Sequence, residues 1–305
     1  MDGLIVIDKP PGLTSHDVVL GVRRLIHGEK TGHCGTLDPD ATGVLLVTVG
    51  KATHLFPFLS GHDKTYRGTI RFGFSTDTYD ASGRPTSPES PDCPDENAVR
   101  GAMRKFEGRI SQTPPPFSAK KLGGQPSYKL ARADKDAVLK AQEVTVRRFE
   151  LEVFRPPLAD FTAECSSGTY IRALAHDLGR LLGCGAHLAG LRRTVSGDFG
   201  LADAHSLDEV LSRAEAGDWQ GLVVPIEKLL PRLPAIRLDV EGEERARHGN
   251  RILPGHVLAL PNGWPDASSG QDPVVRIVAR DGRLLALARP SHDGEGFSPF
   301  LVLSD

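Results

Sequence analysis

The sequence predicts an α+β fold in two parts, a larger domain with a mixed β-sheet flanked by helices and a small β-rich domain. Segments with strand and helix periodicity occur together but do not alternate strictly, which argues against a purely parallel sheet. A length of 305 residues suits two domains. Near Pro231 and Pro234 the pattern changes to short strands separated by Gly, Pro and Asp. We therefore expect domains at 1–232 and 233–305.

The individual elements follow from periodicity and from the residues that stop them. Strands are expected in the larger domain at 4–8, 44–49, 64–75, 144–154, 161–165 and 188–195. Helices are expected to begin at polar N-caps and to end at glycines, from Ser15 to Gly28, Asp95 to Gly108 and Thr169 to Gly183. Leu181 is expected on the apolar face of the third helix. Strands of the small domain are expected at 257–260, 274–279, 284–288 and 300–303.

Several classes of protein are excluded by composition. No run approaches about 18 consecutive apolar residues, so we expect no membrane span. The first residues lack the basic and apolar regions of a signal peptide, which predicts a cytoplasmic protein. Four separated cysteines form no Cys-x-x-Cys pair, so we expect neither a metal site nor disulfides. They are Cys34, Cys93, Cys165 and Cys184.

Charge is unevenly distributed along the chain. The net charge is −2, yet residues 100–155 hold 13 Lys or Arg against 6 Asp or Glu, whereas residues 236–305 hold 8 against 10. The basic region includes an irregular segment, 111–128, in which Lys120 and Lys121 lie between Pro and Gly clusters. Such a segment is usually functional or disordered. Charge alone leaves two readings open, a nucleic-acid-binding face or a solvated surface of mixed charge.

The densest candidate for a site is the Gly-rich loop 32–43, which contains Asp38. Glycines allow tight turns and close approach of a ligand, and Pro39 biases Asp38 away from helical geometry. A carboxylate held in this way can act as a nucleophile or a base. The loop matches neither common phosphate-binding motif. Its local composition alone is more typical of an ordinary turn than of a catalytic loop.

The motifs in this region resemble those of the TruB family of tRNA pseudouridine-55 synthases. The loop 32–43 is similar to the signature loop of that family. Further similar motifs occur in the same order, namely the lysine–proline motif at 8–15, the tyrosine motif at 64–67 with 73–80, the arginine motif at 167–172 and the following element at 185–193. Because an ordinary turn predicts none of these other motifs, their order makes the resemblance specific.

The resemblance implies that uridine 55 in the T-loop of tRNA is flipped out and isomerised to pseudouridine without metal or cofactor. It assigns Asp38 as the nucleophile, leaving open whether the base or the ribose is attacked. Arg172 is implied to pair with Asp38 and keep it ionised. Tyr66 is implied to stack on the uracil, and its hydroxyl is a candidate acid or base.

Six further residues are implied to bind the substrate, namely His33, Tyr170, Leu191, Lys9, Lys120 and Lys121. Lys9 is also expected to support the active-site loop. The region around 100–155 corresponds to an RNA-gripping insertion that would hold the T-arm stem-loop. Residues 233–305 resemble a PUA RNA-binding domain through the segment 246–252.

The resemblance predicts a stand-alone monomeric enzyme with no obligatory protein partner, and three alternative functions compete with it. A relative that works inside a guide-RNA particle shares the active-site motifs, but the basic insertion favours the stand-alone form. An RNA chaperone without catalysis would not need Asp38, Tyr66 and Arg172, and all three are present. A metabolic enzyme with a cofactor would call for a cofactor-binding motif, which the sequence does not show.

Overall fold

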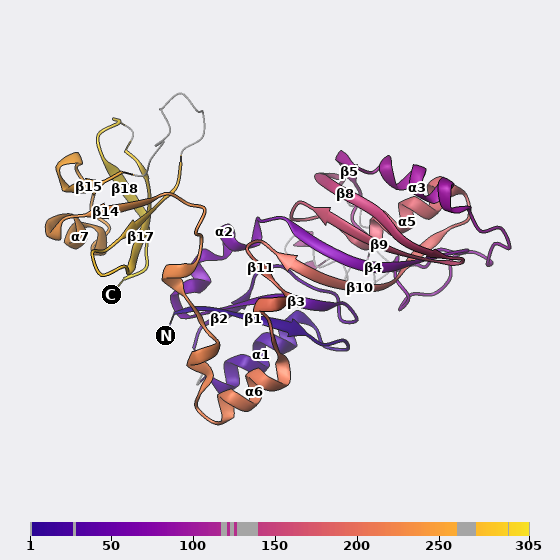
Figure 1. The fold of residues 1–305 in the computed structure, drawn as a ribbon, viewed down its shortest axis with the longest axis horizontal. Coiled ribbons are helices and arrows are strands. Elements are labelled where there is room, and N and C mark those ends of the chain that lie inside the picture. The colour runs from indigo at the N-terminus through magenta and orange to yellow at the C-terminus, as the bar shows by residue number, and fades with distance from the viewer. Residues whose placement is uncertain are drawn as a thin grey trace.

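The computed structural model describes residues 2–26, 29–116, 121–122, 125–126, 140–260, 273–291 and 293–304. It confirms the α+β fold, with two mixed β-sheets and helices packed against them (Figure 1). Among these described residues, no helix is long and apolar enough to span a membrane.

The main sheet joins segments from the first 225 residues. Its central path runs β12-β1-β3-β10-β4-β9-β8-β5. The sheet is mixed because β1 pairs in parallel with β12, and β3 with β10, while the other pairs along this path are antiparallel. Its strands are β1 (Gly3–Lys9), β2 (Thr31–His33), β3 (Thr42–Val49), β4 (Lys64–Phe72), β5 (Gly108–Gln112), β8 (Gln142–Arg155), β9 (Leu158–Cys165), β10 (Ala186–Ser196), β11 (Phe199–Gly200), β12 (His205–Ser206) and β13 (Val224–Pro225).

Of the α-helices in the described part of the chain, five belong to the part that forms the main sheet, and α7 belongs to the part that forms the second sheet. The α-helices are α1 (Ser15–Leu25), α2 (Phe56–Ser60), α3 (Glu96–Arg104), α5 (Ile171–Leu182), α6 (Leu207–Glu215) and α7 (Val240–Arg247). Short 3₁₀ helices are η1 (Gly50–Leu55), η2 (Leu201–Asp203), η3 (Trp219–Leu222), η4 (Ile226–Lys228) and η5 (Pro254–His256). Helices α1 and α6 pack together near β1, whereas α3 and α5 pack near β8 and β10 (Figure 1).

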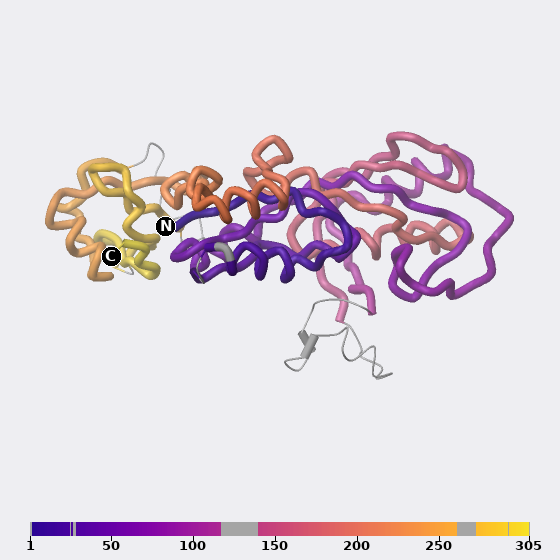
Figure 2. The backbone as a smooth tube through the Cα atoms, turned by 90° about the horizontal axis from the view of Figure 1, so that it is seen from below, coloured from indigo at the N-terminus to yellow at the C-terminus, as the bar shows by residue number. Residues whose placement is uncertain are grey.

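Side-chain alternation along β1 divides the core into two faces. Ile5 and Ile7 point into the large apolar cluster beneath the helices. Leu4 and Val6 point into a second cluster on the opposite face, which also contains Leu284 from the C-terminal sheet. The two sheets therefore share one apolar interface, and the N-terminus lies beside the C-terminal sheet (Figure 2).

The second sheet has the strand order β15-β14-β16-β17-β18. Its strands are β14 (Ala235–Leu238), β15 (Val257–Ala259), β16 (Val275–Val278), β17 (Leu284–Pro290) and β18 (Phe297–Val302). All five strands lie within the segment 233–305, together with α7, a helix that the sequence pattern did not predict. A separate two-stranded ribbon consists of β6 (Lys121–Leu122) and β7 (Gln125–Pro126).

Several predicted element ends were wrong. Thr14, not Ser15, caps α1, because its hydroxyl accepts from the Asp17 N–H. Helix α5 begins after Tyr170 with no side-chain cap, so the predicted cap at Thr169 is also wrong. The Thr169 hydroxyl instead donates to the Ser166 carbonyl. Each error is one or two residues, the usual uncertainty of helix ends.

Two further predictions need correction. Helix α3 ends at Arg104, because the chain turns and Gly108, with φ 95°, begins β5. Leu181, expected in the core, is 48% exposed near the end of α5. Within the region 100–155, where the resemblance predicts the insertion, the two flanks form α3, β5 and β8 of the main fold.

Candidate active site

The loop that carries Asp38 connects β2 to β3, where β10 pairs with both β3 and β4. Gly43 has φ 99°, and a Cβ at this position would lie 2.1 Å from the Arg193 carbonyl oxygen. Only glycine at position 43 therefore permits the backbones of β3 and β10 to lie this close together. The Arg193 side chain, 1% exposed, fixes the loop by donating to the carbonyls of Val44 at 2.7 Å and Gly35 at 3.0 Å.

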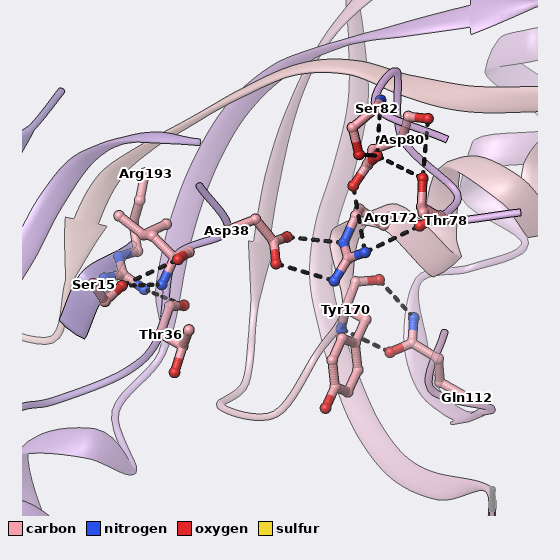
Figure 3. A network of polar contacts seen from close by, with 11 residues as sticks. Ser15, Thr36, Asp38, Thr78, Asp80, Ser82, Gln112, Tyr170, Arg172 and Arg193 are labelled. Carbon is pink, nitrogen blue, oxygen red and sulfur yellow. Dashed lines mark hydrogen bonds and ion pairs between the residues drawn. The ribbon is translucent and has the colours of Figure 1, made fainter. Parts of the chain in front are cut away.

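Asp38 and Arg172 form a two-point ion pair at the centre of the site (Figure 3). Arg172 Nε lies 2.8 Å from Asp38 Oδ2, and Nη2 donates to Oδ1 at 3.0 Å. The Arg172 residue is 7% exposed. Because a guanidinium presents parallel N–H donors, it holds a carboxylate in both position and orientation.

The remaining edge of Arg172 is held by the loop 78–82 (Figure 3). Its Nη1 donates to the Thr78 carbonyl at 3.0 Å and lies 3.3 Å from Asp80 Oδ2. The other oxygen of Asp80 accepts from the Thr78 hydroxyl and from the Ser82 N–H and hydroxyl. Arg172 therefore lies between two carboxylates, of which Asp80 is the more fully hydrogen-bonded.

The environment makes Asp38 the more accessible of these two carboxylates. Its side chain is 39% exposed, compared with 20% for Asp80. The Asp38 carboxylate lies inside a concave site, where surrounding protein atoms replace most of the bulk water although part of its surface is open. This burial raises the pKa of the carboxylate. The Arg172 guanidinium opposes that rise, while the Asp80 charge adds to it. Asp38 is thus a carboxylate of increased basicity that stays close to a fixed cation.

Two cavities meet at the ion pair. The larger has a volume of about 810 Å³ and the smaller about 370 Å³, and both are lined by Asp38, Arg172 and Leu191. His33 lines the larger cavity only. Tyr66 and Tyr170 line the smaller cavity only. The structure therefore gathers six of the sequence-predicted site residues around the two connected spaces.

Tyr66 and Lys64 reach the smaller cavity from the same strand, β4. Tyr66 is 7% exposed, and burial raises the pKa of its phenol although the nearby Arg193 opposes the shift. Tyr66 is therefore a neutral phenol at physiological pH. Burial and the Arg193 charge lower the pKa of Lys64 to about 8, and its ammonium donates to the carbonyls of Ser60 and His62.

Gln112 fixes the chain immediately before Arg172. Its side-chain Nε2 donates to the Tyr170 carbonyl at 3.0 Å, and its Oε1 accepts from the Tyr170 N–H at 2.8 Å (Figure 3). Tyr170 occupies the N-cap position of α5, which has no side-chain cap of its own. The buried amide of Gln112 thus orients the first turn of the helix that carries Arg172.

Comparison with known proteins identifies the family. A model described as "TruB family pseudouridylate synthase (N terminal domain)" matches residues 23–171, and one described as "tRNA pseudouridylate synthase B C-terminal domain" matches 172–231. A tRNA pseudouridine synthase B from Geobacter sulfurreducens is 46% identical over 94% of this chain and 93% of that protein. The chain belongs to the TruB family. The resemblance inferred from the motifs is confirmed, and the protein is a pseudouridine synthase.

Other relatives agree with this assignment. A tRNA pseudouridine synthase B from Thermobifida fusca is 44% identical over 94% of this chain and 94% of that protein. A solved structure described as an H/ACA RNP bound to a substrate RNA containing 2'-deoxyuridine matches with a TM-score of 0.76 and 25% identity, over 99% of this chain and 85% of that chain. A Cbf5-Nop10-Gar1 complex matches with a TM-score of 0.75 and 27% identity, over 98% of this chain and 83% of that chain.

Lys9 of the TruB lysine–proline motif does not line either cavity. The residue is 0% exposed, so the structure places it apart from the cavity-lining residues with which the sequence groups it. The ammonium donates to the carbonyls of Pro10, Leu13 and Pro39 at 2.6–2.8 Å, which uses all three of its N–H bonds. Lys9 therefore supports the loop of Asp38, as the sequence also suggested.

Replacing Lys9 with Met should destabilise the fold. The substitution keeps the length of the side chain but removes the donor that three carbonyls share, of which the Pro39 carbonyl retains the Gly12 N–H. We expect this loss to cost about 3 kcal/mol of unfolding free energy. Urea denaturation followed by circular dichroism measures this change. Lys105→Met, at an exposed position beyond α3, is the matched control and should change stability by less than about 0.5 kcal/mol. Equal stabilities for the two variants would contradict the support role.

Lys120 and the side chain of Lys121 lie outside the described residues.

Three described residues were missed as contributors to the TruB site. Asp80 could have been identified, because it closes the tyrosine motif that was recognised. Arg193 closes the element 185–193 that was also recognised, but its contacts with the loop 35–44 could not be inferred from that motif. Gln112 carried no local signal, since its role depends on contacts with Tyr170, far away in the sequence. Among the described residues, no group of three or more His, Cys, Asp or Glu could hold a metal ion.

Proposed function

We propose that this pseudouridine synthase isomerises uridine 55 in the T-loop of tRNA, using Asp38 as a nucleophile and no cofactor. The assignment of tRNA is supported by the relatives named tRNA pseudouridine synthase B, which match almost the whole chain. The observation that carries the mechanism is the Asp38–Arg172 ion pair at the junction of the two cavities.

In the proposed reaction, the uridine leaves its stack and enters the cavity beside Asp38. The smaller cavity has space for one base, and Tyr66 provides an aromatic surface against which a flipped uracil can stack. The ionised Asp38 adds to the base or the ribose, the N-glycosidic bond breaks, and the base rotates before C5 bonds to C1'. Asp38 departs as a carboxylate, C5 loses its proton, and N1, which has left the ribose, gains one, so the net reaction is an isomerisation.

The larger cavity suits the nucleotides that flank the target. His33 lines it, and burial together with the Arg193 charge lowers the pKa of its imidazole, so a neutral ring faces the RNA. We assign the grip on the T-arm to the basic segment between β5 and β8, which includes Lys120 and Lys121. Residues 233–305 provide a weaker RNA contact as a PUA-like domain, and residues 1–232 form the catalytic domain. The enzyme acts as a monomer.

Purified protein incubated with a transcribed tRNA tests this function. Mass-shift labelling of pseudouridine, followed by sequencing, should show one modified uridine at position 55, and a T-arm stem-loop alone should also react. A transcript with cytidine at 55 is the control. Modification at another position would refute the site assignment but not the synthase activity. No modification by the protein alone would refute stand-alone action.

A guide-dependent enzyme is the second candidate, because the matching solved structures are described as an H/ACA RNP bound to a substrate RNA and as a Cbf5-Nop10-Gar1 complex. They are 25–27% identical to this chain, whereas the two bacterial synthases are 44–46% identical over a similar share. The higher identity favours the stand-alone form. Activity that appears only after addition of a guide RNA and partner proteins would favour the alternative.

The activity should fall at low pH because Asp38 must be ionised to attack. Burial and the Asp80 charge place the Asp38 pKa above its ordinary value of 3.8, so the acid limb of kcat/KM should lie above that of a free carboxyl group. Replacing Asp80 with Asn removes a negative charge that raises this pKa. The acid limb should therefore move to lower pH, even though kcat itself falls. Profiles of kcat/KM against pH, measured between pH 4 and 9 for wild type and Asp80→Asn, test this prediction. A shift of the acid limb to higher pH in the variant would contradict it.

A further inference from the structure

Tyr79 adopts a backbone conformation that side chains disfavour. Its φ is 66°, and the only other described non-glycine residue with positive φ is Leu230. A bulky aromatic residue in the left-handed region is strained, and such outliers gather where surrounding contacts hold them in place. Tyr79 lies between Thr78 and Asp80, the two residues that bind Arg172 Nη1.

The Tyr79 ring stacks on His176. The ring centroids are 3.8 Å apart and the planes differ by 11°. His176 lies one turn after Arg172 on α5, so both side chains leave the same side of the helix toward the loop 78–82. The His176 Nδ1 atom is buried without a hydrogen-bond partner. The face of the imidazole, and not its Nδ1 atom, therefore makes the contact on this side.

The ring of Tyr79 points away from the substrate space. Thr78, Asp80, Ala81 and Ser82 all line the larger cavity, whereas Tyr79 is absent from the described lining of either cavity. The left-handed turn sends this one ring to α5 while its neighbours face the site. The Tyr79 carbonyl also accepts from the Leu188 N–H at 3.0 Å, which anchors the turn to β10.

We propose that the Tyr79–His176 stack is a positioning device that keeps the loop 78–82 against Arg172, and so keeps Arg172 aligned with Asp38. The proposal rests on the proposed role of Asp38 as nucleophile. The stack joins two turns of one rigid unit, because Arg172 binds the residues on either side of Tyr79 while His176 binds Tyr79 itself. Without it, Nη1 would lose a fixed partner and the guanidinium could rotate away from the carboxylate.

Three variants separate the ring from the backbone conformation. Tyr79→Gly retains the left-handed turn, where glycine is unstrained, but removes the ring. It should lower kcat roughly tenfold, since small misplacements of reacting groups are costly, and leave KM for the RNA unchanged. Tyr79→Phe preserves the stack and should behave as wild type. Phe74→Leu is the matched control, because Phe74 also contacts an imidazole, that of His187, with ring centroids 4.7 Å apart.

The pH profile distinguishes positioning from general stability. If Arg172 loses its alignment, less positive charge opposes the raised pKa of Asp38, so the acid limb of Tyr79→Gly should move upward by about half a pH unit. Tyr79→Phe and Phe74→Leu should show no such shift. A raised KM with unchanged kcat would instead mean that the ring contacts RNA, and wild-type behaviour of Tyr79→Gly would mean that the stack is dispensable. Either result overturns the proposal.

A measurement without turnover separates this proposal from the proposed function. In protein labelled with ¹⁵N-arginine, the Arg172 Nε–H resonance is assigned by its loss in Arg172→Lys, and its exchange with solvent reports the ion pair. Tyr79→Gly should accelerate this exchange and Tyr79→Phe should not. If wild type fails to modify tRNA but the exchange behaves as expected, the function is wrong and the positioning role stands. Unchanged exchange in Tyr79→Gly overturns the positioning role even in an active enzyme.

Discussion

Asp38→Asn should abolish pseudouridine formation, with a loss in kcat of at least roughly 10⁴-fold, the scale seen when a catalytic nucleophile is removed. The amide has nearly the same shape as the carboxylate and can still accept a hydrogen bond from Arg172, but it carries no charge with which to attack. Pseudouridine per tRNA, measured under single-turnover conditions by mass-shift labelling, gives the rate directly.

RNA binding by the same variant should remain within about threefold of wild type, because contacts to the phosphate backbone dominate affinity. The chain offers a matched control in Asp63→Asn, the same chemical change at a partly exposed position that lines neither cavity. We expect less than about a fivefold loss of rate from this control, as for surface substitutions away from the reacting atoms. Normal turnover by Asp38→Asn, or equal losses from the two variants, would show that Asp38 is not the nucleophile.

The sequence predicted the elements of the fold better than their ends or the contacts between them. Strand alternation and helical periodicity are local signals, and they located β1, β3, β8 and β10 closely. Helix α7 was missed, because most of its residues are polar and only a few of them are buried. The cap of α1 was misplaced because adjacent polar residues can each serve as a cap, and the start of α5 because Tyr170 precedes the helix without any side-chain cap.

The candidate site shows the same limit. Asp38, Tyr66 and Arg172 could be named because family motifs mark them, and the structure then placed all three at the smaller cavity. The local sequence around Asp38 indicated only a turn. The contacts that hold Arg172 come from Gln112 and from the loop 78–82, which lie about 60 and 90 residues earlier in the chain. Such long-range hydrogen bonds have no periodicity, so pattern analysis of one sequence could not reveal them.

Arg172→Met should reduce kcat roughly 10³-fold, because electrostatic partners of the reacting group contribute on this scale. The substitution removes the cation between Asp38 and Asp80 and leaves two carboxylates facing each other. Since the guanidinium normally opposes the raised pKa of Asp38, its removal should raise that pKa further and move the acid limb to higher pH. This is the opposite of the shift expected for Asp80→Asn, although both substitutions alter the same cluster.

The stability of Arg172→Met should also fall, by about 2 kcal/mol, a modest figure because Asp38 remains partly exposed to solvent. Arg172→Lys keeps the positive charge but not the two-point geometry. Its stability and the position of its acid limb should therefore be close to those of wild type, while its kcat stays about 10²-fold below wild type. Arg180→Met, on the exposed side of the same helix, controls for loss of an arginine from α5. Full activity in Arg172→Lys would show that a positive charge suffices, and that the fixed orientation of Asp38 by two parallel donors does not contribute to the reaction.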